Sequence, residues 1–156
     1  MKRLLLSLVA TAALALPLAA SAAWYGTATL AGTGDADSYG SATISIDNSN
    51  LMTVVVNVYN IDPSTTHVDH IHTGTCAAQG AVYIGLANIV TDGAGFGTST
   101  TVVALTAAQL TTVTTTPVYV NVHHQTTFAG ITCGNVVIGA TPATPGTWGM
   151  VKALYR

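Results

Sequence analysis

The amino-acid sequence predicts an all-β protein, built as a sandwich or a flattened barrel. Short segments rich in Val and Thr recur along the chain, and Gly, Asn, Asp and Pro residues separate them. Short strands at regular spacing with turn residues between them are typical of both architectures. About 133 residues remain after an N-terminal leader, which is enough for one domain with a core of its own.

The expected strands follow one another along the chain, each a Val- or Thr-rich segment bounded by turn residues. They lie near residues 24–31, 40–47, 51–59, 67–72, 81–86, 98–104, 118–123, 136–139 and 148–154. One helical turn is expected where Thr106 is followed three residues later by Gln109, because this spacing has the form of a capping box. The Thr-rich residues 111–116 are expected to be a connector, and residues 92–95 a turn.

The N-terminus has the three-part layout of a secretory signal peptide. Lys2 and Arg3 precede an uncharged Leu- and Ala-rich stretch, and the small residues Ala20-Ser21-Ala22 follow as a cleavage site. We therefore expect a signal peptide over residues 1–22, a single mature domain over residues 23–156, and a periplasmic or secreted location. No later segment has the ~20 apolar residues that a membrane span needs, so membrane insertion is not expected.

Charge is scarce in the mature part of the chain. Its basic side chains are Lys152 and Arg156, against six Asp residues and no Glu. A mildly negative surface is a poor match for nucleic acid or for an anionic membrane, so neither is expected as a partner.

Two cysteines, Cys76 and Cys133, lie in the exported part. An oxidising compartment favours a disulfide between them, although two unpaired buried thiols remain the alternative. The disulfide would close a loop of roughly sixty residues, which is worth roughly 4 kcal/mol in the chain-entropy model.

The histidines are the candidate functional residues. His70 and His72 are two residues apart on an expected strand, so their rings project from one face and can close on a single ion. In the strand near 118–123, valines alternate with Tyr119, Asn121 and His123. His123 therefore lies on the polar face of the strand, which makes it a better third ligand than His124. His67 and His124 are expected to be surface residues.

Three imidazoles without a thiolate or a carboxylate favour copper or zinc, and copper is the tighter binder in the general order of affinities. The rings must be neutral to bind, so binding should weaken as the pH falls below roughly 6 to 6.5. Asn121, Asp69 and Gln125 are candidates for orienting the rings. The alternative is that the histidines are hydrogen-bonded scaffold residues that hold no metal.

Three segments in this order resemble the CHRD (chordin-type) domain and its relatives in the copper/zinc superoxide dismutase-like superfamily. They are His70-Ile71-His72-Thr73-Gly74-Thr75-Cys76, Tyr119-Val120-Asn121-Val122-His123 and Ile131-Thr132-Cys133-Gly134-Asn135-Val136. The resemblance implies an eight-stranded Greek-key β-sandwich or flattened barrel. It also implies that His70 and His72 match the first two copper ligands, that His123 matches the last, and that the two cysteines match the dismutase disulfide.

Departures from the dismutase pattern limit what the resemblance implies. Residues 77–87 contain no His, so the bridging ligand and the zinc site are missing, and Asp92 alone is expected to be a turn residue. Gly130 stands where the dismutases place the Arg that guides superoxide. We expect one copper ion and no zinc, in a binding or copper-handling module. The alternatives are a zinc-less copper superoxide dismutase and a metal-free structural or interaction domain of the cell envelope.

Overall fold

The computed structural model describes residues 22–139. The predicted signal peptide, apart from Ala22, and the predicted strand 148–154 lie outside the described residues. The described elements, in chain order, are β1 (Ala22–Gly32), β2 (Tyr39–Asp47), β3 (Leu51–Tyr59), β4 (Thr66–Gly74), β5 (Gln79–Gly85), β6 (Ile89–Thr91), β7 (Gly97–Ala104), α1 (Ala107–Thr115), β8 (Val118–His124), β9 (Gly130–Asn135) and β10 (Val137–Ile138).

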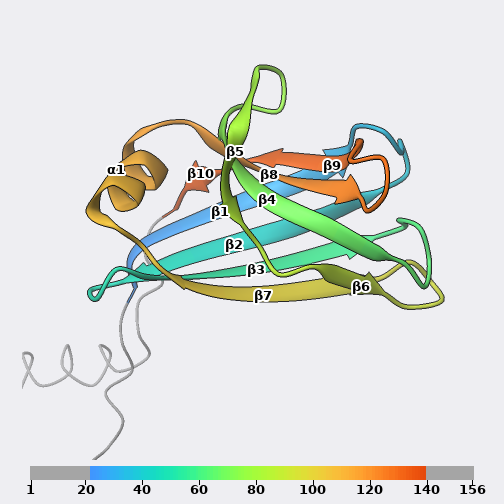
Figure 1. Ribbon diagram of the computed structural model, residues 1–156, viewed down its shortest axis with the longest axis horizontal. Coiled ribbons are helices and arrows are strands. Elements are labelled where there is room, and N and C mark those ends of the chain that lie inside the picture. The colour runs from blue at the N-terminus through green and yellow to red at the C-terminus, as the bar shows by residue number, and fades with distance from the viewer. Residues whose placement is uncertain (1–21, 140–156) are drawn as a thin grey trace, which may run out of the picture.

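Eight antiparallel strands close into a barrel, in the order β1, β2, β3, β7, β6, β4, β8 and β9. The barrel closes where β9 pairs with the end of β1, with Ala31 opposite Cys133 and Gly32 opposite Thr132. Two further strands lie beside this ring, since the short β10 pairs with β1 and β5 pairs with β4 (Figure 1). The chain passes from β3 to β4 with β7 and β6 between them, which is a Greek-key type of connection. The predicted all-β fold is confirmed.

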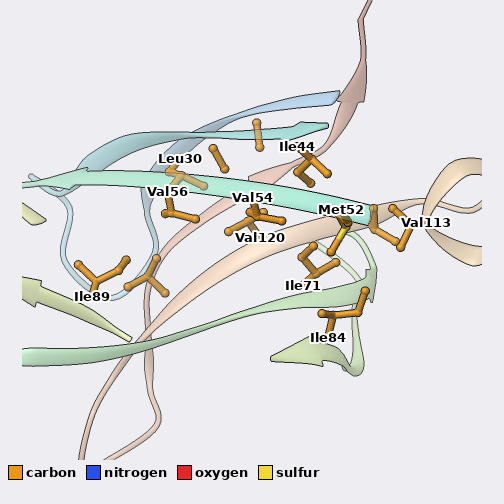
Figure 2. Packing of buried hydrophobic residues seen from close by; sticks show 14 of the residues in the cluster. Leu30, Ile44, Met52, Val54, Val56, Ile71, Ile84, Ile89, Val113 and Val120 are labelled. Atoms are coloured by element: carbon orange, nitrogen blue, oxygen red, sulfur yellow. The ribbon is translucent and has the colours of Figure 1, made fainter. Parts of the chain in front are cut away.

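The core fills the inside of the barrel. Strict alternation along β2 and β3 turns Ile44, Ile46, Val54 and Val56 inward, where all are at most 1% exposed. Val120 of β8 packs from the opposite wall (Figure 2). Burying one such side chain is worth about 1.5–3 kcal/mol, so this core holds the walls that carry the functional site.

The helix is longer than the sequence predicts. The capping box is present, because Thr106 Oγ1 accepts from the Gln109 N–H and the Gln109 side chain accepts from the Thr106 N–H. The Thr-rich segment expected to be a connector forms the second half of the helix. The hydroxyls of Thr111 and Thr115 donate to the carbonyl four residues earlier, and Val113 is buried in the core. None of the described residues forms a helix long and apolar enough to span a membrane.

The sequence does not predict β6 or β9. The strand expected near 136–139 is the short β10, and β9 comes just before it. β9 carries Cys133, which forms the predicted disulfide with Cys76, with 5.9 Å between the two Cα atoms. The Cys76 N–H also donates to Asn135 Oδ1 at 2.8 Å, so the loop after β4 is tied to β9. The alternative of two free thiols is wrong.

Candidate metal centre

Strand β4 carries two of the three candidate histidines on its outer face. Ile71 between them is fully buried in the core, so His70 and His72 point away from it. β8 pairs antiparallel with β4 and places His123 opposite Val68, on the same outer face. The alternation of faces therefore brings histidines from two neighbouring strands to one side of the barrel wall.

The three rings converge. One ring nitrogen from each of His70, His72 and His123 lies within 4.8 Å of the others. The ring centroids are 5.8 Å apart for His70 and His72, 5.4 Å for His70 and His123, and 5.5 Å for His72 and His123. This set could hold a metal ion.

Backbone carbonyls fix the orientation of two of the rings. His72 Nδ1 lies 3.1 Å from the Gly80 carbonyl oxygen, and His123 Nδ1 lies 3.0 Å from the Phe128 carbonyl oxygen. A carbonyl oxygen only accepts hydrogen bonds, so each Nδ1 must carry the proton. In the neutral rings the Nε2 atoms are therefore bare acceptors.

These two acceptors face each other. His72 Nε2 and His123 Nε2 are 3.3 Å apart, and in the neutral rings neither has a proton to donate. His70 Nδ1 is also buried and has no hydrogen-bond partner. Two lone pairs at this distance repel each other unless a proton or a cation lies between them. The donor atoms thus fit a metal ion.

The electrostatic environment favours neutral rings. Burial lowers the pKa of His70, and the neighbouring rings of His123 and His72 lower it further. Burial also lowers the pKa of His123, where the Phe128 carbonyl acts in the opposite direction. Because charging the His70 or the His123 ring is costly, the nitrogens of these two rings are available for a metal at neutral pH.

Tyr119 is part of the site, although the sequence analysis did not single it out. It lies opposite His72 across the β4–β8 pair, and its ring stacks on the His72 ring with centroids 4.9 Å apart and planes 21° apart. The Tyr119 side chain is 1% exposed. Stacking on one side and the Gly80 carbonyl at Nδ1 therefore hold His72 in place.

The predicted orienting side chains do not have this role. Asp69 is on the core face of β4, where it accepts a hydrogen bond from Ser99 Oγ at 3.1 Å. Asn121 lies opposite His70, but its Oδ1 atom is buried without a partner. Gln125 has no side-chain hydrogen bond within the described part of the chain. The actual acceptors are backbone carbonyls, which carry no side-chain signal in a sequence.

The remaining histidines are outside the cluster. His67 is fully buried, so the expectation of a surface residue is wrong for it, and its Nε2 is 3.3 Å from the Asp62 carbonyl oxygen. Side chains alternate between the two faces of a strand, so His67 points to the same inner face of β4 as Ile71. His124 is partly exposed, and its Nε2 lies 3.5 Å from Asp62 Oδ2.

Asp92 and Gly130 are the positions at which the sequence was expected to depart from the dismutase pattern. Asp92 Oδ1 accepts from the N–H groups of Ala94 and Phe96 at 2.8 and 2.9 Å, as expected of a turn residue. Gly130 pairs with His123 across the β8–β9 ladder, so its position is beside the histidine cluster. No Lys or Arg side chain occurs between residues 22 and 139.

A family model described as the CHRD domain matches residues 21–131. The matched range includes all three clustered histidines and the first cysteine of the disulfide. No curated protein matches the chain.

Proposed function

Because the chain belongs to the CHRD domain family, we propose that it is an exported domain that binds one copper ion through His70, His72 and His123. In this proposal it acts as a binding or copper-handling module related to the superoxide dismutase-like superfamily. The observation that carries the proposal is the pair of bare Nε2 atoms of His72 and His123, held 3.3 Å apart by carbonyls on their other ring nitrogens.

A shared proton would also relieve the repulsion between these two nitrogens. That alternative is disfavoured because burial lowers the pKa of His123, and the neighbouring His72 ring also lowers it. A metal ion uses all three lone pairs at once. Two of the three rings, those of His72 and His123, are already oriented, so little conformational entropy is lost there on binding.

The chemistry of the donors supports copper. Three neutral imidazoles suit copper and zinc, and copper binds such donors more tightly. When bound, copper would supply a redox-active centre with an open coordination position. The protein's residues contribute a partly buried setting, in which His72 is 6% exposed and the other two rings are half-buried.

A zinc-less copper superoxide dismutase is the enzymatic alternative. Superoxide is an anion, and attraction by nearby cations speeds its capture. The described residues offer no Lys or Arg for this, and Gly130 stands where the dismutase pattern has its guiding Arg. The site therefore fits copper binding better than rapid dismutation.

An exported location agrees with the disulfide, because disulfides persist in oxidising compartments. We include the signal peptide over residues 1–22 and a single mature domain over residues 23–156 in the proposal. Mass spectrometry of the protein recovered from the exporting cell should show a mature N-terminus at Ala23 or Trp24.

The test is copper stoichiometry of the mature protein after loading and desalting. The parent should retain one equivalent, and a His70→Ala/His123→Ala double variant should retain none. His124→Ala is the matched control, because His124 is adjacent to His123 in sequence but outside the cluster, and this variant should keep the full equivalent. Equal retention by the parent and a folded double variant would support the hydrogen-bonded scaffold instead.

A further inference from the structure

Most carboxylates of the described chain gather at one end of the barrel. The loops β1–β2, β3–β4, β6–β7 and β8–β9 lie together there, at the right of Figure 1. Asp35 and Asp37 belong to the first loop, Asp62 to the second and Asp92 to the third. The loops are joined by hydrogen bonds, such as that from the Ser64 N–H to the Asp92 carbonyl oxygen at 2.9 Å. We call this region the acidic end.

The negative charge of the acidic end is barely balanced. The four Lys and Arg residues of the chain are Lys2, Arg3, Lys152 and Arg156, and all lie outside residues 22–139. Within the described range, the basic group that contacts one of these carboxylates is His124, which pairs with Asp62. Among the described residues, the acidic end therefore carries an excess of negative charge.

A row of exposed aromatic rings borders the acidic end on the outer face of the sheet. Tyr39 starts β2, Tyr59 ends β3 and Phe96 precedes β7, and their side chains are 52%, 37% and 37% exposed. Tyr39 and Tyr59 stack with centroids 5.0 Å apart, and Phe96 follows Tyr59 at 5.0 Å. These three residues form the aromatic strip. Contiguous exposed apolar residues, unlike single ones, are typical of interaction surfaces.

Carboxylates flank both ends of the aromatic strip. Asp37 is two residues before Tyr39, and the Asn60 side chain donates to the Asp37 carbonyl oxygen at 3.4 Å beside Tyr59. At the other end, Asp92 accepts from the Phe96 N–H. An Asp therefore lies within a few residues of each end of the strip, and residues 22–139 contain no Lys or Arg that would pair with it.

We propose that the aromatic strip and its flanking carboxylates form a docking surface for a protein segment rich in arginine or lysine. Arginine stacks on aromatic faces and pairs with carboxylates through the same guanidinium group. The net charge of the acidic end would attract such a segment before contact. A neutral saccharide could use the rings but would gain nothing from the excess charge.

This surface is separate from the copper proposal. The histidine cluster is on β4 and β8, whereas the aromatic strip is on β2, β3 and the start of β7. Docking at the strip does not require a metal, so the two proposals can fail independently.

The test is an NMR titration of the isotope-labelled mature protein with a hexa-arginine peptide at low and at physiological salt. Backbone shifts should concentrate at the strip and at the acidic end, and the affinity should fall as salt rises. Asp37→Asn/Asp92→Asn should weaken binding at least fivefold, and Tyr39→Ser/Tyr59→Ser should do the same. Asp92→Asn keeps an acceptor oxygen for the N–H groups of Ala94 and Phe96, so the first pair is expected to fold normally.

Asp47→Asn is the matched control, since Asp47 ends β2 at the opposite end of the barrel. Its Oδ1 also accepts from backbone N–H groups, those of Ser49 and Leu51 at 2.8 and 2.9 Å. This variant should bind within twofold of the parent. The proposal is overturned if Asp47→Asn and the Asp37/Asp92 pair have equal effects, or if the shifts lie elsewhere. It is also overturned if hexaglutamate or a neutral cello-oligosaccharide binds the strip as tightly as the peptide.

Discussion

Replacing Asp69 by asparagine should remove a large part of the pH dependence of stability. Asp69 is fully buried on the inner face of β4, between the outward-pointing histidines and the core. Ser99 Oγ donates to its Oδ2 at 3.1 Å, whereas Oδ1 is buried without a partner. Burial raises the pKa of Asp69 from its usual value of 3.8 to about 7, and the Ser99 hydrogen bond offsets only part of this effect.

The sign follows from comparing the folded and unfolded chains. Between about pH 4 and 7 the folded chain keeps the Asp69 proton and the unfolded chain has lost it, so folding becomes less favourable as pH rises. The pKa of Asp69 is about three units higher in the folded chain than in the unfolded chain, and each unit corresponds to about 1.4 kcal/mol. The unfolding free energy should therefore be about 4 kcal/mol lower at pH 8 than at pH 4 because of this residue. The lowered pKa values of His70 and His123 act in the opposite direction below pH 6.5, so the parent alone would give a mixed slope.

The assay is urea unfolding of the metal-free parent and of Asp69→Asn at several pH values from 4 to 8. The two proteins share every other titrating group, so the difference between their unfolding free energies isolates Asp69. The unfolding free energy of the parent minus that of the variant should fall by about 4 kcal/mol from pH 4 to pH 8. A difference that stays constant to within about 1 kcal/mol would refute the reasoning, because Asp69 would then titrate in the folded protein as it does in water.

Three further predictions concern the metal site and its support. Tyr119→Leu removes the ring stacked on a ligand and should weaken Cu(I) binding about tenfold in a chelator competition, whereas Tyr119→Phe should stay within twofold. Cys76→Ser/Cys133→Ser should lower the urea unfolding free energy by about 4 kcal/mol, and an unchanged value would contradict the cross-link argument. Because burial lowers the pKa values of His70 and His123, equilibrium dialysis should show copper retained at pH 6.5 and released only at lower pH. Complete release of copper by pH 6.5 would contradict the argument that the His70 and His123 rings are neutral and arranged for the metal at that pH.

The alternation of side chains between the two faces of a strand was the informative signal in the sequence. It places His70 and His72 on one face of β4 and leaves Ile71 for the core, and the structure has this arrangement. The same rule, applied to the polar phase near 118–123, selects His123 over His124. The capping box at Thr106 and Gln109 was equally readable, because a helix start depends on residues close together in the chain.

Features that depend on distant partners were not predicted. β9 contains Gly130, Gly134 and Asn135, which favour turns, and it is a strand because β8 and β1 pair with it on either side. The Thr-rich half of α1 is helical because its hydroxyls find carbonyls four residues earlier and Val113 reaches the core. The carbonyls of Gly80 and Phe128 orient two rings, and no sequence pattern marks a backbone acceptor.

The central claim is that the nitrogens of three histidines are arranged for one metal ion. Long-range proton–nitrogen NMR of the histidine rings, before and after one equivalent of diamagnetic Cu(I), tests it most directly. The account predicts that the apo rings of His72 and His123 carry their proton on Nδ1, and that Cu(I) shifts their Nε2 resonances together with one nitrogen of His70. Protons on Nε2 in the apo protein, or Nε2 resonances unmoved by Cu(I), would contradict it.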